Sequence, residues 1–303
     1  MSSNRVGNYR VHAIFRVGGS RDRCGARVPV VAVQFFATCL VEMLRPEVGA
    51  AAQRTLRAAG HDPQAVRGAT CCGQPAYNAG YAREARRVAR RTLRALGNVD
   101  AACVVASGSC ATMMSHHWPE LFEGTPDADA ARGVAARTVE LTSFLVGARS
   151  PQSQPTSERD AEDGSGNGTA GTEADETRGT NQAGSSDDGE PDGAAVVVHD
   201  SCHALRELGA GTTVRRALTE AGHTPVSAGG AERCCGFGGS FSVKLPDVSV
   251  AMADEKLDSF VAAGCEQVTS CDLSCLLHLQ GRSRRRGLPL RFDHVATLLD
   301  HEA

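Results

Sequence analysis

The feature that most constrains this chain is a cysteine pattern that occurs twice. In each copy a single cysteine is followed 32 residues later by the first of an adjacent pair, and a fourth cysteine comes 38 or 40 residues after that pair. The two sets are Cys39, Cys71, Cys72, Cys110 and Cys202, Cys234, Cys235, Cys275. Matched spacing over such distances indicates a duplication, so we expect two related domains with four thiols each.

The cysteines also bear on where the protein works. The first 27 residues mix arginines and glycines and contain no apolar run long enough for export, and no stretch approaches the ~18–20 apolar residues that span a bilayer. We therefore expect a soluble, cytoplasmic protein without membrane insertion. The formal net charge of −3 gives no reason to expect a nucleic acid partner. Twelve reduced cysteines suggest metal or redox chemistry, although several could be small buried hydrophobes.

The composition divides the chain into four segments. Residues 147–193 contain no Val, Leu, Ile, Met or aromatic residue, and carry eleven acidic against three basic side chains. Such a stretch cannot bury enough apolar surface to offset its ordering entropy. We predict a disordered N-terminal extension (1–27), a first domain (28–146), an acidic disordered linker (147–193) and a second domain (194–303).

Strand-like and helix-like patterns alternate in both halves. β-branched or apolar runs predict strands over 28–36, 101–106, 194–198 and 265–269, and periodic patterns predict helices over 46–60, 79–96, 212–221 and 246–263. In the helix over 79–96 we expect Ala85, Val88, Leu93 and Leu96 on the buried side. Alternation predicts an α/β fold with two pseudo-repeated domains, each a small, mostly parallel sheet flanked by helices. Ligands of such sheets collect at the carboxyl ends of the strands, where the four thiols of one half can converge.

The spacing favours an iron–sulfur cluster over a single ion at each set. Structural zinc usually takes C-x₂₋₄-C knuckles, whereas adjacent cysteines splay apart and strain the backbone when both bind one ion. A cluster offers separate irons to the two sulfurs, and thiolate is its usual protein ligand. We interpret the glycine after each pair, Gly73 and Gly236, as room for the backbone to pass a bulky inorganic core. Zinc and simple buried thiols remain the alternatives.

Several longer motifs resemble the cysteine-rich CCG domain family. They are Cys71-Cys72-Gly73-Gln74-Pro75-Ala76-Tyr77-Asn78, the run from Cys234-Cys235-Gly236 to Lys244, Phe36-Ala37-Thr38-Cys39, Ser107-Gly108-Ser109-Cys110-Ala111-Thr112 and His199-Asp200-Ser201-Cys202-His203. One of the subunits of heterodisulfide reductase and the iron–sulfur subunit of glycolate oxidase belong to this family. Within it, the sequence is most similar to the lactate utilisation proteins A, and the resemblance covers about residues 30–146 and 195–300.

The resemblance implies a function and a set of ligands. It implies an electron-transfer subunit of a complex that oxidises L-lactate or a related 2-hydroxy acid, with other subunits, including a second iron–sulfur protein, as partners. The cofactors would be two iron–sulfur clusters, of [4Fe–4S] type or a non-cubane variant, held by the eight patterned cysteines. In heterodisulfide reductase the last element is C-x-x-C, but here Ser107 and Asp272 occupy the positions of the additional cysteines. Cys271, one place earlier, is a candidate extra ligand.

Other residues have a plainer interpretation beside the functional one. Cys103 and Cys265 fall in predicted buried strands, which favours core packing, and Cys24 belongs to the N-terminal extension. His199 and His203 flank a predicted ligand and could tune a cluster by donating to sulfur, although an ordinary structural hydrogen bond is commoner. The run of arginines after residue 281 could dock an acidic partner, but a solvated turn is the plainer interpretation.

Two rival functions remain open. A thiol–disulfide reductase would act at the cluster itself, whereas a zinc-stabilised scaffold would have no redox role. The sequence contains no recognisable pattern for a flavin, nicotinamide or phosphate-binding loop, and no catalytic triad, so we predict no catalytic residues and expect two-electron chemistry to need a partner.

Overall fold

The computed structural model describes residues 19–21, 27–29, 31–149 and 193–301. Most of the predicted N-terminal extension, including Cys24, and most of the predicted linker lie outside the described residues. Strand β1 (Gly19–Arg21), in the predicted extension, pairs in antiparallel fashion with β2 (Arg27–Pro29), which crosses into the predicted first domain. The last helix of the first half, α8 (Leu141–Arg149), continues three residues past the boundary expected at 146.

Each half contains a four-stranded, wholly parallel sheet within the described residues. The first has the order β4-β3-β5-β6 and the second β10-β9-β7-β8, so corresponding strands follow the same path. The expected α/β fold with two pseudo-repeated sheets is therefore confirmed. The strands are β3 (Val31–Phe36), β4 (His61–Ala65), β5 (Cys103–Val105), β6 (Thr138–Glu140), β7 (Ala195–Val198), β8 (Thr224–Val226), β9 (Gln267–Ser270) and β10 (Arg291–His294).

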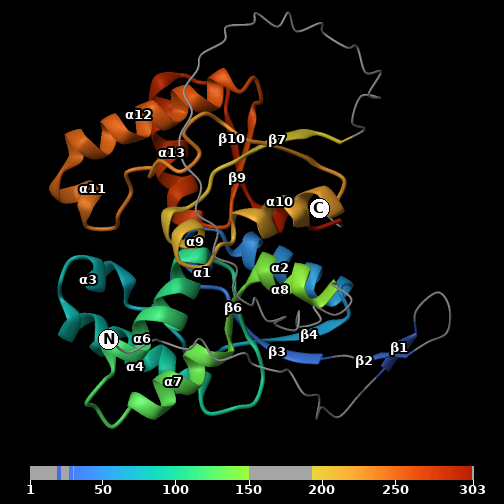
Figure 1. The fold of residues 1–303 in the computed structure, drawn as a ribbon, viewed down its shortest axis with the longest axis vertical. Helices are drawn as coiled ribbons and strands as arrows, with labels where there is room; N and C mark the ends of the chain where they lie inside the picture. The colour runs from blue at the N-terminus through green and yellow to red at the C-terminus, as the bar shows by residue number, and fades with distance from the viewer. Residues whose placement is uncertain (1–18, 22–26, 30, 150–192, 302–303) are drawn as a thin grey trace, which may run out of the picture. The chain divides into compact units, whose positions relative to one another are not determined.

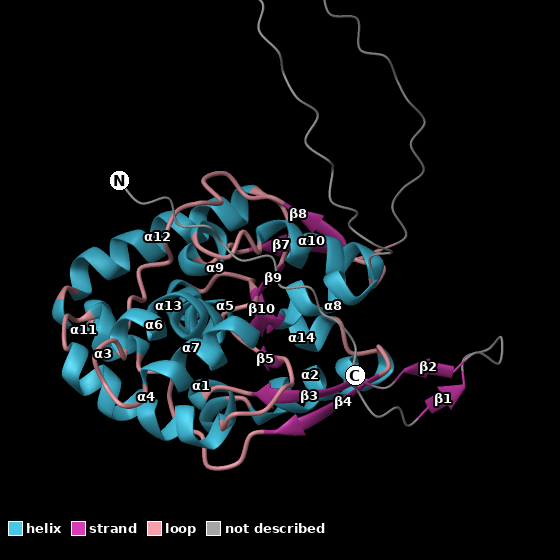
Figure 2. Cartoon of the chain, turned by 60° about the horizontal axis from the view of Figure 1, so that its bottom comes forward, coloured by secondary structure: helices cyan, strands magenta, loops and turns pink. Residues whose placement is uncertain are grey.

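Helices connect the strands and cover the sheets (Figures 1 and 2). In the first half they are α1 (Cys39–Leu44), α2 (Pro46–Ala58), α3 (Gln74–Asn78), α4 (Ala82–Leu96), α5 (Gly108–Thr112), a π-helical turn (Met113–His117), α6 (Trp118–Leu121), α7 (Ala128–Arg137) and α8. In the second half they are α9 (Cys202–Arg206), α10 (Gly211–Glu220), α11 (Phe241–Lys244), α12 (Pro246–Ala262), α13 (Leu273–Arg286) and α14 (Val295–Leu298).

Helix α4 illustrates where the periodicity was informative and where it failed. Its buried residues are Ala85, Ala89, Thr92, Leu93 and Leu96, a stripe at helical spacing. Val88, expected on the same side, is 40% exposed because it lies at the edge of that stripe. Small alanines at the centre let α4 pack closely, and in the second half α12 occupies the corresponding place after its cysteine pair.

The two halves share part of their hydrophobic interior. One buried cluster combines Val33 and Phe35 of β3 with Val198 of β7 and the apolar residues of α10 and α14. Across the halves, α5 packs against α9, α2 against α14 and α8 against α10. The described parts of residues 1–149 and 193–303 accordingly form one compact unit. This junction brings the two sets of cysteines to the same region.

Candidate metal centre

The single cysteine of each set opens a helix just beyond a central strand. Chain leaving β3 reaches Cys39 at the start of α1, and chain leaving β7 reaches Cys202 at the start of α9. The fourth cysteines, Cys110 in α5 and Cys275 in α13, follow β5 and β9. Because these are neighbouring parallel strands, their carboxyl ends meet at one edge of each sheet, as the sequence predicted.

The adjacent pairs lie in loops that both end in a left-handed glycine. Gly73 has φ 91° and Gly236 has φ 86°, and each N–H donates to the first sulfur of its pair at 3.4 Å. A Cβ atom at Gly73 would lie 2.7 Å from the Ala85 carbonyl oxygen, and one at Gly236 would lie 2.5 Å from that of Ser249. The glycines therefore let the loop approach α4 and α12, which corrects our interpretation that they make room for an inorganic core.

All eight patterned cysteines line one cavity of about 300 Å³. Within the first set, the sulfurs of Cys72 and Cys110 are 3.2 Å apart. We expected each set to converge at the edge of its own sheet; in addition, the two edges face a common space at the junction of the halves. The first three cysteines of each set are 163 residues apart between the halves. Equivalent residues of the two halves therefore line opposite sides of the cavity.

In each half, hydrogen bonds between the thiols favour the thiolate form of the first cysteine of the adjacent pair. Hydrogen bonding from Cys39, and then from Cys72, lowers the pKa of Cys71 to about 3. In the second half, Cys202 and then Cys235 lower the pKa of Cys234 to about 2. The same hydrogen bonds raise the pKa values of the donating thiols. Thiolate is the form that binds metals, so both sets contain a sulfur prepared for ligation.

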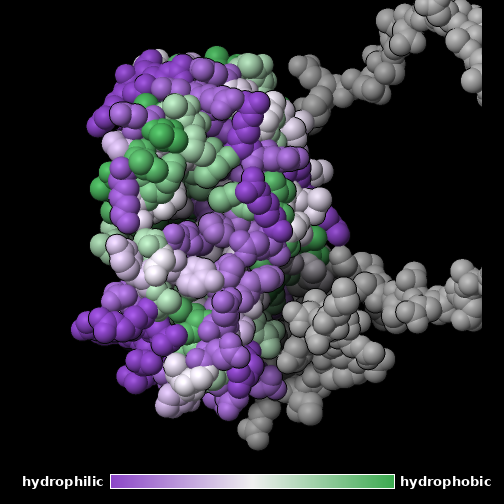
Figure 3. Space-filling model, turned by 60° about the vertical axis from the view of Figure 1, so that its left-hand side comes forward, coloured by the Kyte–Doolittle hydropathy of each residue, from purple (hydrophilic) through white to green (hydrophobic). Residues whose placement is uncertain are grey.

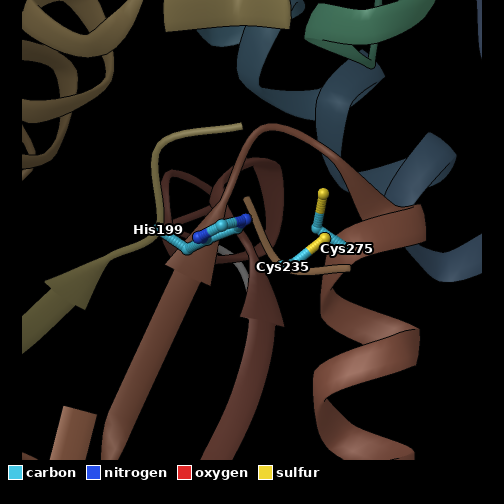
Figure 4. A group of neighbouring side chains, drawn as sticks. All are labelled: His199, Cys235 and Cys275. Atoms are coloured by element: carbon cyan, nitrogen blue, oxygen red, sulfur yellow. The ribbon is translucent and has the colours of Figure 1, made fainter. Parts of the chain in front are cut away.

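Cys275 differs from its counterpart in the first half. Its pKa is lowered to about 6, chiefly by hydrogen bonding from Cys235. His199 follows β7 and is 1% exposed. Its ring projects toward Cys235 and Cys275 (Figure 4), and one ligand atom from each of the three residues lies within 4.8 Å of the others. Neither ring nitrogen has a hydrogen-bond partner among the described residues.

Ser107 and Asp272, which occupy the positions of the additional cysteines of heterodisulfide reductase, contact each other. Ser107 Oγ donates to Asp272 Oδ1 at 2.6 Å, and Ser109 Oγ and Ser109 N–H donate to the same carboxylate at 2.7 and 3.0 Å. Asp272 is 0% exposed, so these bonds tie the two cysteine loops together inside the protein. Cys271 belongs to the shared hydrophobic cluster and packs against Gly108; it is not among the residues that line the cavity.

The rim of the cavity is formed by α3 and by the loop before α11. A Cβ atom at Gly239 would lie 3.6 Å from Pro75, and the Lys244 ammonium lies 5.4 Å from the centre of the Tyr81 ring. Val243, beside Lys244, is among the exposed large hydrophobic side chains. On the side drawn in Figure 3, hydrophobic side chains lie in small groups between hydrophilic ones.

Sequence reasoning missed three residues of this region. Thr38 precedes Cys39 with φ 79°, and it is the non-glycine residue with positive φ within the described part of the chain. It is buried and lines the cavity, and no sequence signal would have found it. The role of Asp272 as a hydrogen-bond acceptor was also missed. Lys256 had a signal, because it is one of only two lysines in the chain; it is buried and binds the carbonyls of Gly230 and Ala231 in the loop before the second cysteine pair.

The remaining candidates are resolved by position. Cys103 is buried in β5, as expected, whereas Cys265 lies in the turn before β9 and is only partly buried. His203 lines the cavity, with Nδ1 3.6 Å from the sulfur of Cys202. The arginines after residue 281 end α13 instead of forming a turn, and Arg282 and Arg286 bind Asp254 of α12.

Comparison with known proteins gives the same division of the chain. A protein family described as "Cysteine-rich domain" matches residues 33–115 and again 196–280. The chain is 35% identical to a protein of Exiguobacterium sp. named lactate utilization protein A, over 88% of this chain and 96% of that one. Proteins of the same name from Geobacillus kaustophilus and Bacillus subtilis are 34% and 32% identical, each over 88% of this chain and 98% of the relative. No helix in the described part of the chain is long and apolar enough to cross a membrane.

Proposed function

This chain belongs to the lactate utilization protein A family of cysteine-rich domain proteins, and on that premise we propose that it carries electrons in the oxidation of L-lactate through two iron–sulfur clusters. The observation that carries the proposal is the pair of matched thiol sets facing one cavity. The names of the relatives supply the metabolic context. We place the protein in the cytoplasm, where cysteine thiols stay reduced.

The donor set suits this cofactor. Each set offers four sulfurs and, in the first half, no oxygen or nitrogen ligand belongs to the pattern. Adjacent cysteines on each wall provide sulfurs for different irons of a cluster. Cys71 and Cys234 are already biased toward thiolate, and the unpartnered nitrogens of His199 face the second set. A bound cluster would supply one-electron transfer; the residues hold it and limit its contact with water.

The Ser107–Asp272 contact supports four ligands per site. A fifth thiol would have to replace one of these side chains, and the carboxylate accepts bonds from both serine hydroxyls. An ordinary [4Fe–4S] cluster is therefore the form we propose for each set. The same contact argues against direct disulfide reduction of the kind that relies on additional cysteines.

A zinc-stabilised scaffold is the second candidate, because one observation favours it. His199, Cys235 and Cys275 form a buried group of the type that binds zinc, with the required atoms close together. A zinc ion at that group would not explain why the first half also has four matched cysteines, since it has no histidine at the corresponding position. We therefore rank this candidate lower.

An electron carrier of this kind should not oxidise lactate alone. Iron–sulfur clusters take one electron at a time, whereas lactate oxidation removes two, so other subunits would supply the acceptor for substrate. Purified, cluster-loaded protein should form no pyruvate from L-lactate with an artificial one-electron acceptor, and should do so when partner subunits are added. Sustained pyruvate formation by this chain alone would contradict the relay role.

A further inference from the structure

Matching positions of the two halves carry different chemistry around their cysteines. Three residues before the first cysteine of each set stand Phe36 and His199, both at the end of the central strand and both buried. A second matching position lies on the helix that packs against each cysteine pair. The carbonyl next to the glycine of the pair belongs to Ala85 in the first half and to Ser249 in the second. Seven residues after it come Thr92 and Lys256, which are both buried. The first half thus has an apolar ring and a neutral hydroxyl where the second has an imidazole and an ammonium.

His199 and Phe36 differ in what they present to the sulfurs. Phe36 belongs to the same hydrophobic cluster as Cys72 and offers no hydrogen-bond donor. The imidazole of His199 lies beside Cys235 and Cys275, and both its nitrogens lack partners among the described residues. One nitrogen of a neutral imidazole carries a proton, so the ring has an N–H available for sulfur. The second site therefore has a donor that the first lacks.

Lys256 and Thr92 perform the same structural task with different charge. Thr92 Oγ1 donates to the Cys71 carbonyl at 3.0 Å and accepts from Thr70 N–H at 3.0 Å. Lys256 Nζ donates to the carbonyls of Gly230 and Ala231, at 2.9 and 2.8 Å. Both side chains hold the loop that leads to a cysteine pair, but only Lys256 carries an ammonium group.

The ammonium of Lys256 has surroundings that compensate for its burial. Besides two carbonyl oxygens, the face of the Phe260 ring lies 5.6 Å from Nζ. Burial is the main effect on its pKa and lowers it, while Asp200, Cys235 and Cys275 oppose that shift. The same Phe260 ring packs edge-on against His199, with the ring centroids 6.2 Å apart, so Lys256 adjoins the residues that face Cys235 and Cys275.

Two carboxylates in the same region act in the opposite direction. Asp200 is paired with Arg215 through two contacts of 2.7 and 2.8 Å, so its charge is largely neutralised. Asp272 accepts three hydrogen bonds from Ser107 and Ser109 of the first half, which disperses its charge. What distinguishes the second site is therefore the imidazole of His199 and the ammonium of Lys256, which have no counterparts at Phe36 and Thr92.

We infer that the two sites are electrically unequal, and that His199 and Lys256 give the cluster of the second set the higher reduction potential. This inference rests on the proposed function. Reduction adds negative charge to a cluster, and hydrogen bonds to sulfur and nearby positive charge stabilise the reduced form. Bound clusters with this difference in potential would favour one-electron transfer from the first set to the second. His199 and Lys256 are positioning residues that act on the cluster's potential.

The test is a redox titration of the anaerobically purified full-length protein, followed by electron paramagnetic resonance. Wild-type protein should show two potentials. Cys72→Ser, which disrupts the first set, should retain the higher one, and Cys235→Ser should retain the lower one. Equal potentials, or the reverse assignment, would overturn the inference while leaving the clusters themselves intact. Absence of iron and acid-labile sulfide from wild-type protein would instead overturn the proposed function, and the inference with it.

Replacement by the residue that the first half uses isolates the two side chains. His199→Phe and Lys256→Thr should each lower the higher potential by an amount equal to about a tenfold change in the oxidised-to-reduced ratio, about 59 mV for a one-electron couple. The lower potential should stay unchanged, as should both potentials in Arg285→Thr, a control that removes an exposed cation at the C-terminal end of α13. Lys256→Met, which keeps length without charge, replaces Lys256→Thr if that variant fails to fold. An unchanged higher potential in both His199→Phe and the Lys256 variant would refute the role of these side chains. Loss of one cluster's iron from His199→Phe would refute the donor role of His199, because it would make the residue a ligand.

Discussion

Replacement of Gly236 by alanine tests how the second cysteine loop is held against its helix. At this position φ is 86°, and the new Cβ atom would lie 2.5 Å from the Ser249 carbonyl oxygen, a backbone atom inside α12. A left-handed conformation costs a non-glycine residue about 1–2 kcal/mol. Displacement of packed backbone adds about 1–3 kcal/mol. Gly236→Ala should therefore lower the free energy of unfolding by about 2–5 kcal/mol.

Gly264→Ala provides the matched control for that variant. Gly264 has a similar φ of 75°, but no atom lies within 4 Å of the position its Cβ would take. Gly264→Ala should lower the free energy of unfolding by only about 1–2 kcal/mol, the cost of the left-handed backbone conformation. Urea unfolding of both variants, followed by circular dichroism, measures the difference. If Gly236→Ala is no less stable than Gly264→Ala, the close approach of loop and helix does not constrain this position.

Three further predictions follow from the contacts between and within the halves. Asp272→Asn should lower the free energy of unfolding by about 1.5–3 kcal/mol, because it weakens charged hydrogen bonds to Ser107 and Ser109; a urea midpoint equal to wild type would contradict this. Burial raises the pKa of Glu140 above 4.5, so the folded state binds this proton more tightly than the unfolded state does. The free energy of unfolding should therefore fall as pH rises from 4.5 toward the folded pKa. Glu140→Gln should remove this pH dependence, which unfolding curves between pH 4 and 8 would detect. Replacement of residues 150–190, which contain no cysteine, by a short Gly/Ser stretch should leave the iron content unchanged; a soluble variant without iron would show that the segment does more than connect.

Local patterns predicted most of the fold because the duplication repeats them. Pro46 and Pro246 mark the starts of two long helices, and both fall where the sequence indicated. The apolar runs 28–36 and 194–198 gave the central strands, and parallel topology followed from alternation. Val88 was misplaced because a position at the edge of an apolar stripe is buried or exposed according to the neighbour it meets.

The common cavity could not be predicted from the sequence. Spacing indicates which thiols of one half converge, but whether two edges face each other depends on contacts between distant segments, such as Ser107 with Asp272. The role of Gly236 was misinterpreted for the same reason, since the facing atom belongs to Ser249 on another element. The asymmetry of His199 and Phe36 was visible in the sequence once the halves were aligned, but the unpartnered ring nitrogens were not.

Iron and acid-labile sulfide in anaerobically purified protein test the central claim most directly. Two thiol sets on one cavity predict iron and sulfide equivalent to two clusters, together with the brown colour of iron–sulfur thiolates. Cys72→Ser and Cys235→Ser should each lose about half of the iron. Stoichiometric zinc without labile sulfide in wild-type protein would contradict the account, and loss of all iron from either single variant would contradict two separate sites.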